Sequence, residues 1–233
     1  MKPTLLQRLA SEALGTAFLL AIVVGSGIMA ERLAAGNMAI ALLANTLATG
    51  AGLVALILTF APISANFNPV VTAMAAAQKE IVWRAVPAYV AAQCIGALAG
   101  VAAAHLMFGH ALFTPSTKIR ASGGEIFAES IATFGLLLVI ASVAKHRAAA
   151  LPYAVAAYIT AAYWFTASTS FANPAVTLAR AVTESFAGIR VADAPAFVLA
   201  QLMGLAVALV VIRFLFGASG AILVNTSAIG NDE

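Results

Sequence analysis

The sequence predicts an all-α integral membrane protein with six transmembrane helices and two re-entrant half-helices in an inverted repeat. Its composition, its apolar runs and a duplicated Asn-Pro segment lead to this prediction. The 233 residues are 63% hydrophobic and 9% charged, with a mean hydropathy of +1.00, whereas soluble domains are roughly 45–50% apolar and about 25% charged. Since about 20 apolar residues cross a bilayer, residues 1–233 have room for about six spans in a single domain.

The apolar runs set the predicted spans, and polar turns separate them. The expected spans are residues 13–30, 38–63, 86–108, 126–144, 148–165 and 194–216. An additional segment of about ten residues opens on Asn-Pro at Asn68 and another at Asn173, ending near residues 77 and 181. Each is too short to cross the bilayer, so each is expected to enter the membrane and stop there.

The second half of the chain repeats the first. NPVVT at Asn68 recurs as NPAVT at Asn173, and Glu-x3-Thr at Glu12 recurs at Glu129. Because Glu12 belongs to this repeat, the first apolar run is interpreted as part of the fold and not as a cleaved signal peptide. The repeats cover about residues 5–108 and 122–217, and a polar tail covers residues 218–233. Three spans per half is an odd number, so the halves insert with opposite topology, as in many transport proteins.

Charge and cysteine content exclude several classes of function. Twelve basic and nine acidic residues give a net charge of +3, but the basic residues are scattered through the loops, so the expected partner is a lipid bilayer and not nucleic acid. The single cysteine, Cys94, excludes an intramolecular disulfide and a cysteine metal cluster. The three histidines lie apart at span ends, which indicates neither a metal site nor an enzyme. No cofactor and no catalytic residue is expected.

The positive-inside rule gives the expected orientation. With the N-terminus inside, the inner side holds seven lysines and arginines and the outer side holds five. The chain is therefore expected to be a multi-pass protein of the cell membrane with both termini in the cytoplasm.

The two half-helices are expected to meet at the middle of the membrane. Asn is a favoured N-cap and Pro is tolerated at the first helical position. The residues placed at this midplane are Asn68, Pro69, Val70, Asn173, Pro174 and Ala175. Each helix start carries roughly half a positive elementary charge, so cations and protons are repelled from both sides. The asparagine amides can donate to the oxygen of a neutral solute, which passes.

The equivalent carboxylates Glu12 and Glu129 lie within predicted spans, where a charge is costly. The preferred interpretation is that each is buried and accepts hydrogen bonds from the backbone of the adjoining re-entrant segment. The alternative is a carboxylate at the membrane interface. Gln93 and Gln201, also equivalent, are interpreted as hydrogen-bonding partners between helices.

The doubled Asn-Pro box and the paired glutamates resemble the major intrinsic protein family, the aquaporins and aquaglyceroporins, over essentially all of residues 5–217. The resemblance implies an aquaporin-like right-handed bundle and a homotetramer with one pore in each subunit. It also implies a passive channel for water and small neutral solutes such as glycerol-sized polyols.

The sequence departs from the family pattern at the selectivity constriction. The family usually has Arg directly after the second Asn-Pro-Ala, but Val176 stands here, and Arg180 lies four residues further along. A position that is usually a large aromatic falls on Thr49. The remaining constriction positions are assigned to Ile159, Thr160 or Ala161 on the fifth span, with Thr160 preferred, and to Ser170 and Phe171 in the following loop.

Loss of the aromatic residue and of the arginine predicts a wider and less charged mouth than that of a water-specific channel. This combination resembles bacterial aquaglyceroporin-like members associated with arsenic detoxification. It adds neutral arsenic and antimony hydroxides to the expected solutes and the bacterial inner membrane as the expected location. Two alternatives stay open, a water-only aquaporin and a secondary active transporter, although a transporter needs a coupling-ion site beyond Glu12 and Glu129.

Overall fold

A computed structural model describes residues 3–217, so the predicted polar tail lies outside the described residues. Over residues 3–217 the structure contains helices and no strand. The long helices are α1 (Leu5–Leu33), α2 (Met38–Phe60), α4 (Val86–Phe108), α5 (Gly123–His146), α6 (Leu151–Phe165) and α8 (Ala194–Phe216). The short helices are α3 (Pro69–Ala77) and α7 (Pro174–Arg180), and single 3-10 turns cover Trp83–Ala85 and Ala148–Ala150.

Six helical segments in the described range are long and apolar enough to cross a membrane. Together with the two short helices they confirm the predicted all-α architecture. The main difference lies at helix starts. α1 begins at Leu5 and not at residue 13, because Thr4 and Gln7 form a capping box that continues the helix through polar residues. Ser122 and Glu125 cap the start of α5 in the same way.

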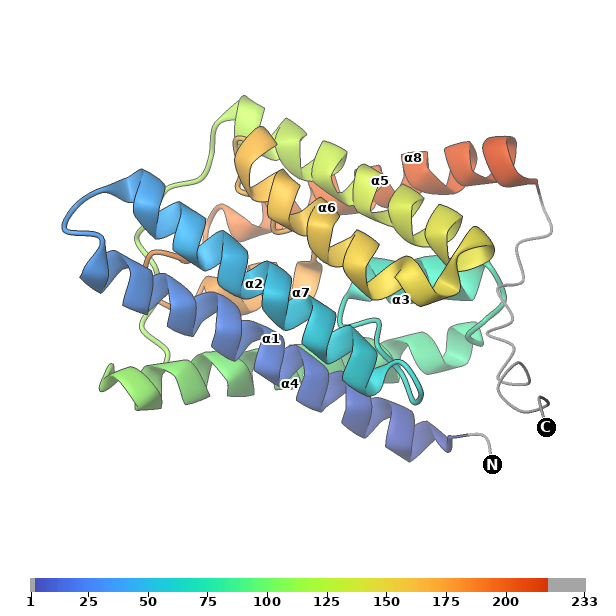
Figure 1. The fold of residues 1–233 in the computed structure, drawn as a ribbon, viewed down its shortest axis with the longest axis horizontal. Coiled ribbons are helices and arrows are strands. Elements are labelled where there is room, and N and C mark those ends of the chain that lie inside the picture. Colours follow the sequence, from blue (N-terminus) through green and yellow to red (C-terminus); the bar gives the residue numbers. More distant parts are fainter. Residues whose placement is uncertain (1–2, 218–233) are drawn as a thin grey trace, which may run out of the picture.

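The two halves are inverted relative to one another. Helices α1 to α4 of the first half correspond to α5 to α8 of the second, and α1 and α5 run in opposite directions through the bundle (Figure 1). Helix α1 packs on α4, α5 packs on α8, and the half-helices α3 and α7 touch one another. The start of α1 and the end of α8 lie at the same end of the bundle (Figure 1).

Glycines bring the long helices of each half close together. A Cβ atom added to Gly96 on α4 would lie 2.2 Å from the carbonyl oxygen of Ala13 on α1. A Cβ added to Gly204 on α8 would lie 2.5 Å from the carbonyl oxygen of Ser130 on α5. Any larger residue would push these helices apart, and with them the side chains that support the half-helices.

Candidate functional site

A cavity of about 260 Å³ runs along the middle of the bundle. The long helices that border it contribute residues at intervals of four, which lie on one face of a helix. These residues are Leu19 and Val23 on α1, Thr49, Leu53 and Ile57 on α2, Leu136, Ile140 and Ala144 on α5, and Leu151, Val155, Ile159 and Tyr163 on α6. The α6 stripe alone spans about 18 Å at 1.5 Å per residue. The wall is mostly apolar, so the few polar groups on it decide what can bind.

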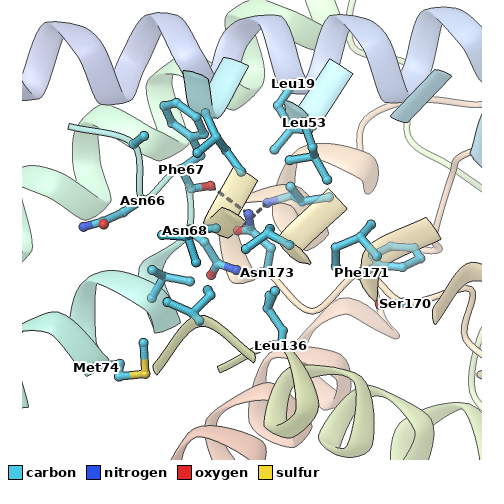
Figure 2. Close-up of a pocket in the computed structure, with 18 of the residues that line it drawn as sticks. Leu19, Leu53, Asn66, Phe67, Asn68, Met74, Leu136, Ser170, Phe171 and Asn173 are labelled. Carbon is cyan, nitrogen blue, oxygen red and sulfur yellow. Dashed lines mark hydrogen bonds between the residues drawn. The ribbon is translucent and has the colours of Figure 1, made fainter. Parts of the chain in front are cut away.

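The re-entrant segments contribute most of the polar lining. From the first segment come Asn66, Phe67, Asn68, Val71, Met74, Ala75, Gln78 and Glu80, and from the second come Ser170, Phe171, Asn173, Val176 and Arg180. Asn68 and Asn173 lie close together in the centre, with Met74 toward one side and Ser170 and Phe171 toward the other (Figure 2). The end lined by Thr49, Tyr163, Ser170, Phe171, Val176 and Arg180 is called the mouth below.

Asn68 and Asn173 are bonded reciprocally across the centre. The Nδ2 of Asn68 donates to the carbonyl of Ala172, and the Nδ2 of Asn173 donates to the carbonyl of Phe67, both over 2.8 Å. Each Oδ1 accepts from a backbone N–H in the first turn of its own helix. A side-chain amide has two N–H donors, so one donor of each asparagine is left for a molecule in the cavity.

The residue before each asparagine has a left-handed backbone. Phe67 has φ 52° and Ala172 has φ 49°, a conformation that costs a non-glycine residue of order 1–3 kcal/mol. It directs each carbonyl toward the asparagine of the opposite half. Surrounding groups must therefore hold this turn in place.

Glu12 holds the first turn. Its side chain is completely buried, and its carboxylate accepts from the backbone N–H groups of Asn66 at 2.8 Å and Phe67 at 2.7 Å. The Ser64 hydroxyl and the Gln93 side-chain amide also donate to it. A carboxylate satisfied by several donors can remain buried within a membrane protein.

Glu129 repeats this arrangement in the second half. It is also completely buried and accepts from the N–H groups of Phe171 and Ala172, each at 2.8 Å. Gln201 donates to it at 2.7 Å, as Gln93 does to Glu12. Both carboxylates thus lie in the protein interior and not at its surface.

Four of the residues assigned to the midplane do not line the cavity. Pro69, Val70, Pro174 and Ala175 form the first turns of the half-helices, and Val70 and Ala175 are each only 1% exposed within the packed core. The third and seventh residues after an Asn lie on its face of the helix, because a turn takes 3.6 residues. Val71 and Ala75 on α3 and Val176 and Arg180 on α7 occupy these positions and line the cavity, whereas the two prolines and the residues directly after them do not.

The assignment of Thr160 to the constriction needs correction, because Thr160 does not line the cavity. Its hydroxyl donates to a carbonyl of its own helix at 2.8 Å, and a Cβ on Gly50 of α2 would lie 2.2 Å from it. Thr160 therefore packs at the contact between α2 and α6. The cavity is lined by Ile159, one of the alternatives, while Ala161 is exposed.

Tyr163 was missed by sequence reasoning. It lines the cavity in the last turn of α6, and its hydroxyl lies 3.4 Å from that of Thr49. The spacing of four from Ile159 could have indicated it, because residues four apart share a helix face. The small Thr49 is therefore accompanied by an aromatic residue at the same level of the pore.

Arg180 is absent from the predicted constriction because it lies four residues beyond the usual arginine position. It lines the mouth, although it is only 2% exposed. Its Nε donates to the carbonyl of Ala187, and its guanidinium carbon lies 3.4 Å from the centre of the Phe171 ring. The spacing of four residues from Val176 could have indicated that Arg180 lines the pore, because it places both residues on one face of α7.

Arg120, from the linker between the halves, holds the loop at the mouth. Its Nε donates to the carbonyl of Gly188 and its Nη1 to the carbonyl of Ser168, each at 3.0 Å. Its backbone N–H donates to Asp193 at 2.9 Å, and its guanidinium lies 5.1 Å from the centre of the Phe171 ring. The linker is therefore part of the mouth and not only a connection.

Lys118 adds to the positive charge near the mouth. Its Nζ donates to the carbonyl of Phe186 at 2.7 Å. Burial, and to a smaller extent repulsion from Arg120 and Arg180, lower the pKa of Lys118 to about 8. Across the described part of the chain, the only ion pair joins Arg190 to Asp193, so the buried Arg180 has no acidic partner there.

Comparisons with known proteins settle the family. The family model described as Major intrinsic protein matches residues 1–159. The chain belongs to the major intrinsic protein family. Aquaglyceroporin AqpS from Rhizobium meliloti (strain 1021) is 49% identical over 224 residues, which is 96% of each protein. Aquaporin NIP1-4 from Oryza sativa subsp. japonica is 33% identical over 147 residues, 62% of this chain and 52% of that protein.

A solved structure supports the same fold. The aquaglyceroporin from Plasmodium falciparum matches 91% of this chain and 95% of its own with a TM-score of 0.69, at 21% identity. The resemblance found in the sequence is confirmed, and this member of the major intrinsic protein family is a passive membrane channel and not an enzyme.

Proposed function

We propose that this channel conducts water and uncharged hydroxylated solutes of about glycerol size, and that it excludes ions. The observation that carries this proposal is the pair Asn68 and Asn173, which line a mostly apolar cavity and whose amides each keep one N–H beyond the bond to the opposite half. A polyol suits this wall because its hydroxyl oxygens can accept from the two amides while its carbon atoms contact Leu53 and Val155.

Ion exclusion follows from the same centre. The half-helices α3 and α7 are capped by Asn68 and Asn173 and are in contact. Each helix start carries roughly half a positive elementary charge, so a cation is repelled along both approaches. The mostly apolar wall offers little to replace the hydration shell of an ion along the length of the cavity, and desolvation of an isolated charge is very costly.

The proposed solutes include neutral hydroxides of trivalent arsenic and antimony. Like glycerol, these molecules carry three hydroxyl groups on a small uncharged body, and the two asparagine donors would meet the same oxygen chemistry. The small side chains of Thr49 and Val176 support passage of solutes larger than water. The similarity to an aquaglyceroporin over 96% of both chains is in keeping with this range of solutes.

We also propose a homotetramer in the bacterial inner membrane with both chain termini in the cytoplasm. Its support is the charge count of seven inner against five outer basic residues and the large apolar side chains exposed on the long helices. Chemical cross-linking in membranes tests the tetramer. Accessibility of tags at each terminus tests the orientation.

Stopped-flow light scattering of proteoliposomes tests the channel function. The panel comprises water, glycerol, urea and trivalent arsenic hydroxide, each with and without a sodium or proton gradient. The expected result is rapid downhill flux of water, glycerol and arsenic hydroxide that does not respond to either ion gradient. Flux of water alone would identify a water-only pore. Accumulation against a solute gradient would identify a secondary transporter.

A further inference from the structure

The two half-helices present equivalent faces to the cavity. The third and seventh residues after each asparagine line it, namely Val71 and Ala75 on α3 and Val176 and Arg180 on α7. On α3 both of these residues are apolar, whereas on α7 the second of them, Arg180, carries a guanidinium group. Arg180 thus reaches the cavity from a position that the fold makes pore-facing in both halves.

Two arginines contact the Phe171 ring, but their guanidinium groups differ in the hydrogen bonds that they make. Arg120 donates to two backbone carbonyls and does not line the cavity. Arg180 lines the cavity and donates to the carbonyl of Ala187 through Nε. Among residues 3–217, no acceptor is found for its two terminal nitrogens. The terminal N–H donors of Arg180 are therefore available to a molecule at the mouth.

Ser170 presents a second uncommitted polar group at the same end. It lines the cavity, is 3% exposed, and its Oγ has no hydrogen-bond partner in the described part of the chain. Buried hydroxyls are normally bonded, so an unpartnered one on a cavity wall requires an explanation. Ser170 directly precedes Phe171, on whose ring Arg180 is stacked.

We propose that Arg180 and Ser170 form the specificity-determining polar ring at the mouth, with Tyr163 and Thr49 on the facing wall. The guanidinium donates to a solute oxygen while the serine hydroxyl accepts from or donates to the same solute. The proposal rests on the proposed conduction of polyols and extends it, because it assigns size selection and a second cation barrier to Arg180.

The physical consequences are a narrower and more positive mouth than Thr49 and Val176 alone would produce. The long side chain of Arg180 occupies space that the short Val176 leaves open one turn away. Its charge repels cations before they reach the central asparagines, and low-dielectric surroundings strengthen that repulsion. Solutes with an acceptor oxygen gain a hydrogen bond there.

The Arg180→Gln variant tests both consequences in proteoliposomes. A glutamine amide nitrogen occupies the position of the arginine Nε, so the variant can still donate to Ala187 while it lacks the charge and the terminal nitrogens. The ratio of xylitol to glycerol permeability is expected to rise about tenfold, a change of about 1.4 kcal/mol in relative barrier, and sodium leak is expected to increase. Arg190→Gln removes the same charge from a side chain that is 42% exposed and serves as the matched control.

Unchanged xylitol-to-glycerol ratio and sodium leak in Arg180→Gln would overturn the proposal. So would equal changes in Arg180→Gln and Arg190→Gln. A parent channel that conducts no glycerol would instead refute the proposed function. The sodium leak of the variant would still test the charge assigned to Arg180.

A second experiment leaves Arg180 intact, in case its replacement prevents folding. Ser170→Cys in a Cys94→Ala background is treated with methanethiosulfonate reagents that carry either a sulfonate or an ammonium group. Because a positive, confined site concentrates anions, the sulfonate reagent is expected to react about tenfold faster than the ammonium reagent, relative to their rates with a free thiol. Modification is expected to block glycerol flux. Lack of reaction, equal relative rates or unchanged flux would each contradict the proposal.

Discussion

Around Asn68 and Asn173 the two halves of the channel are built from the same parts, whereas seven residues further on one half carries Ala75 and the other Arg180. The matching parts include the buried carboxylates, the glutamines that donate to them and the left-handed turns before each asparagine. The difference separates two tasks. Duplicated residues fix the geometry of the centre, and residues present in one half shape one end of the pore.

The linker between the halves reinforces this difference. It contributes Arg120, which holds the loop at the mouth. The backbone of the linker also bonds to that of the second half, through Ser116 to Ala181 and through Lys118 to Arg190. The opposite end of the cavity is lined by Gln78 and Glu80, which follow the first half-helix. An inverted repeat can therefore keep a symmetric centre and still have two chemically different ends.

The largest effect is expected from removing a central carboxylate. Glu12→Ala and Glu129→Ala each leave buried backbone donors unpaired at about 1–3 kcal/mol per group, against a typical total stability of about 5–15 kcal/mol. Both variants are expected to give little monodisperse protein in detergent and a lower thermal midpoint, with similar severity. Glu31→Ala, at an exposed position, is the control. Normal stability of either variant would show that the two carboxylates do not support their halves equally.

A large effect on flux is expected from Asn68→Asp and Asn173→Asp. Aspartate is also a favoured N-cap, so the helices can form, but an ionised carboxylate cannot donate and its charge offsets the helix dipoles. Glycerol flux is expected to fall about tenfold, and cation leak to rise, to a similar extent in both variants. The control is Asn37→Asp, at the exposed N-cap of α2. Markedly unequal effects would show that the centre is not functionally symmetric.

A selective effect is expected from the double variant Thr49→Phe, Val176→Arg. It adds a ring beside Tyr163 and a second guanidinium one turn from Arg180. Glycerol and arsenic hydroxide fluxes are expected to fall about tenfold, with a smaller loss of water flux, measured by the same stopped-flow assay. Each single variant is the control for the other. Parental glycerol flux in the double variant would mean that the mouth does not limit solute size.

The smallest effect is expected from Thr160→Val. Valine has nearly the same shape, and Thr160 packs between α2 and α6 outside the cavity. Glycerol and water permeabilities are expected to change by less than about twofold. Ile159→Ala, one position earlier on the cavity wall, is the comparison and is expected to change the glycerol-to-water ratio. A strong effect of Thr160→Val on either permeability would show that Thr160 does belong to the selectivity constriction.

Much of the fold was determined by the sequence itself. Hydrophobic run length set the spans, so residues 86–108 and 194–216 were predicted with the bounds of α4 and α8. The duplicated Asn-Pro box and the paired Glu12 and Glu129 indicated the inverted repeat, because a repeated motif forces repeated local structure. The asparagine centre was predicted for the same reason, since capping and helix length are local properties.

The composition of the mouth was decided only by the tertiary structure. It brings together α2, α6, the loop before Asn173, α7 and the linker, and no local rule fixes the rotation of one helix relative to another. A shift of one residue turns a helical side chain by about 100°, which is why Ile159 faces the pore and Thr160 does not. The same geometry places Arg180, four residues beyond Val176, on the cavity wall. Packing between distant segments, and not the Asn-Pro motif, selected these residues.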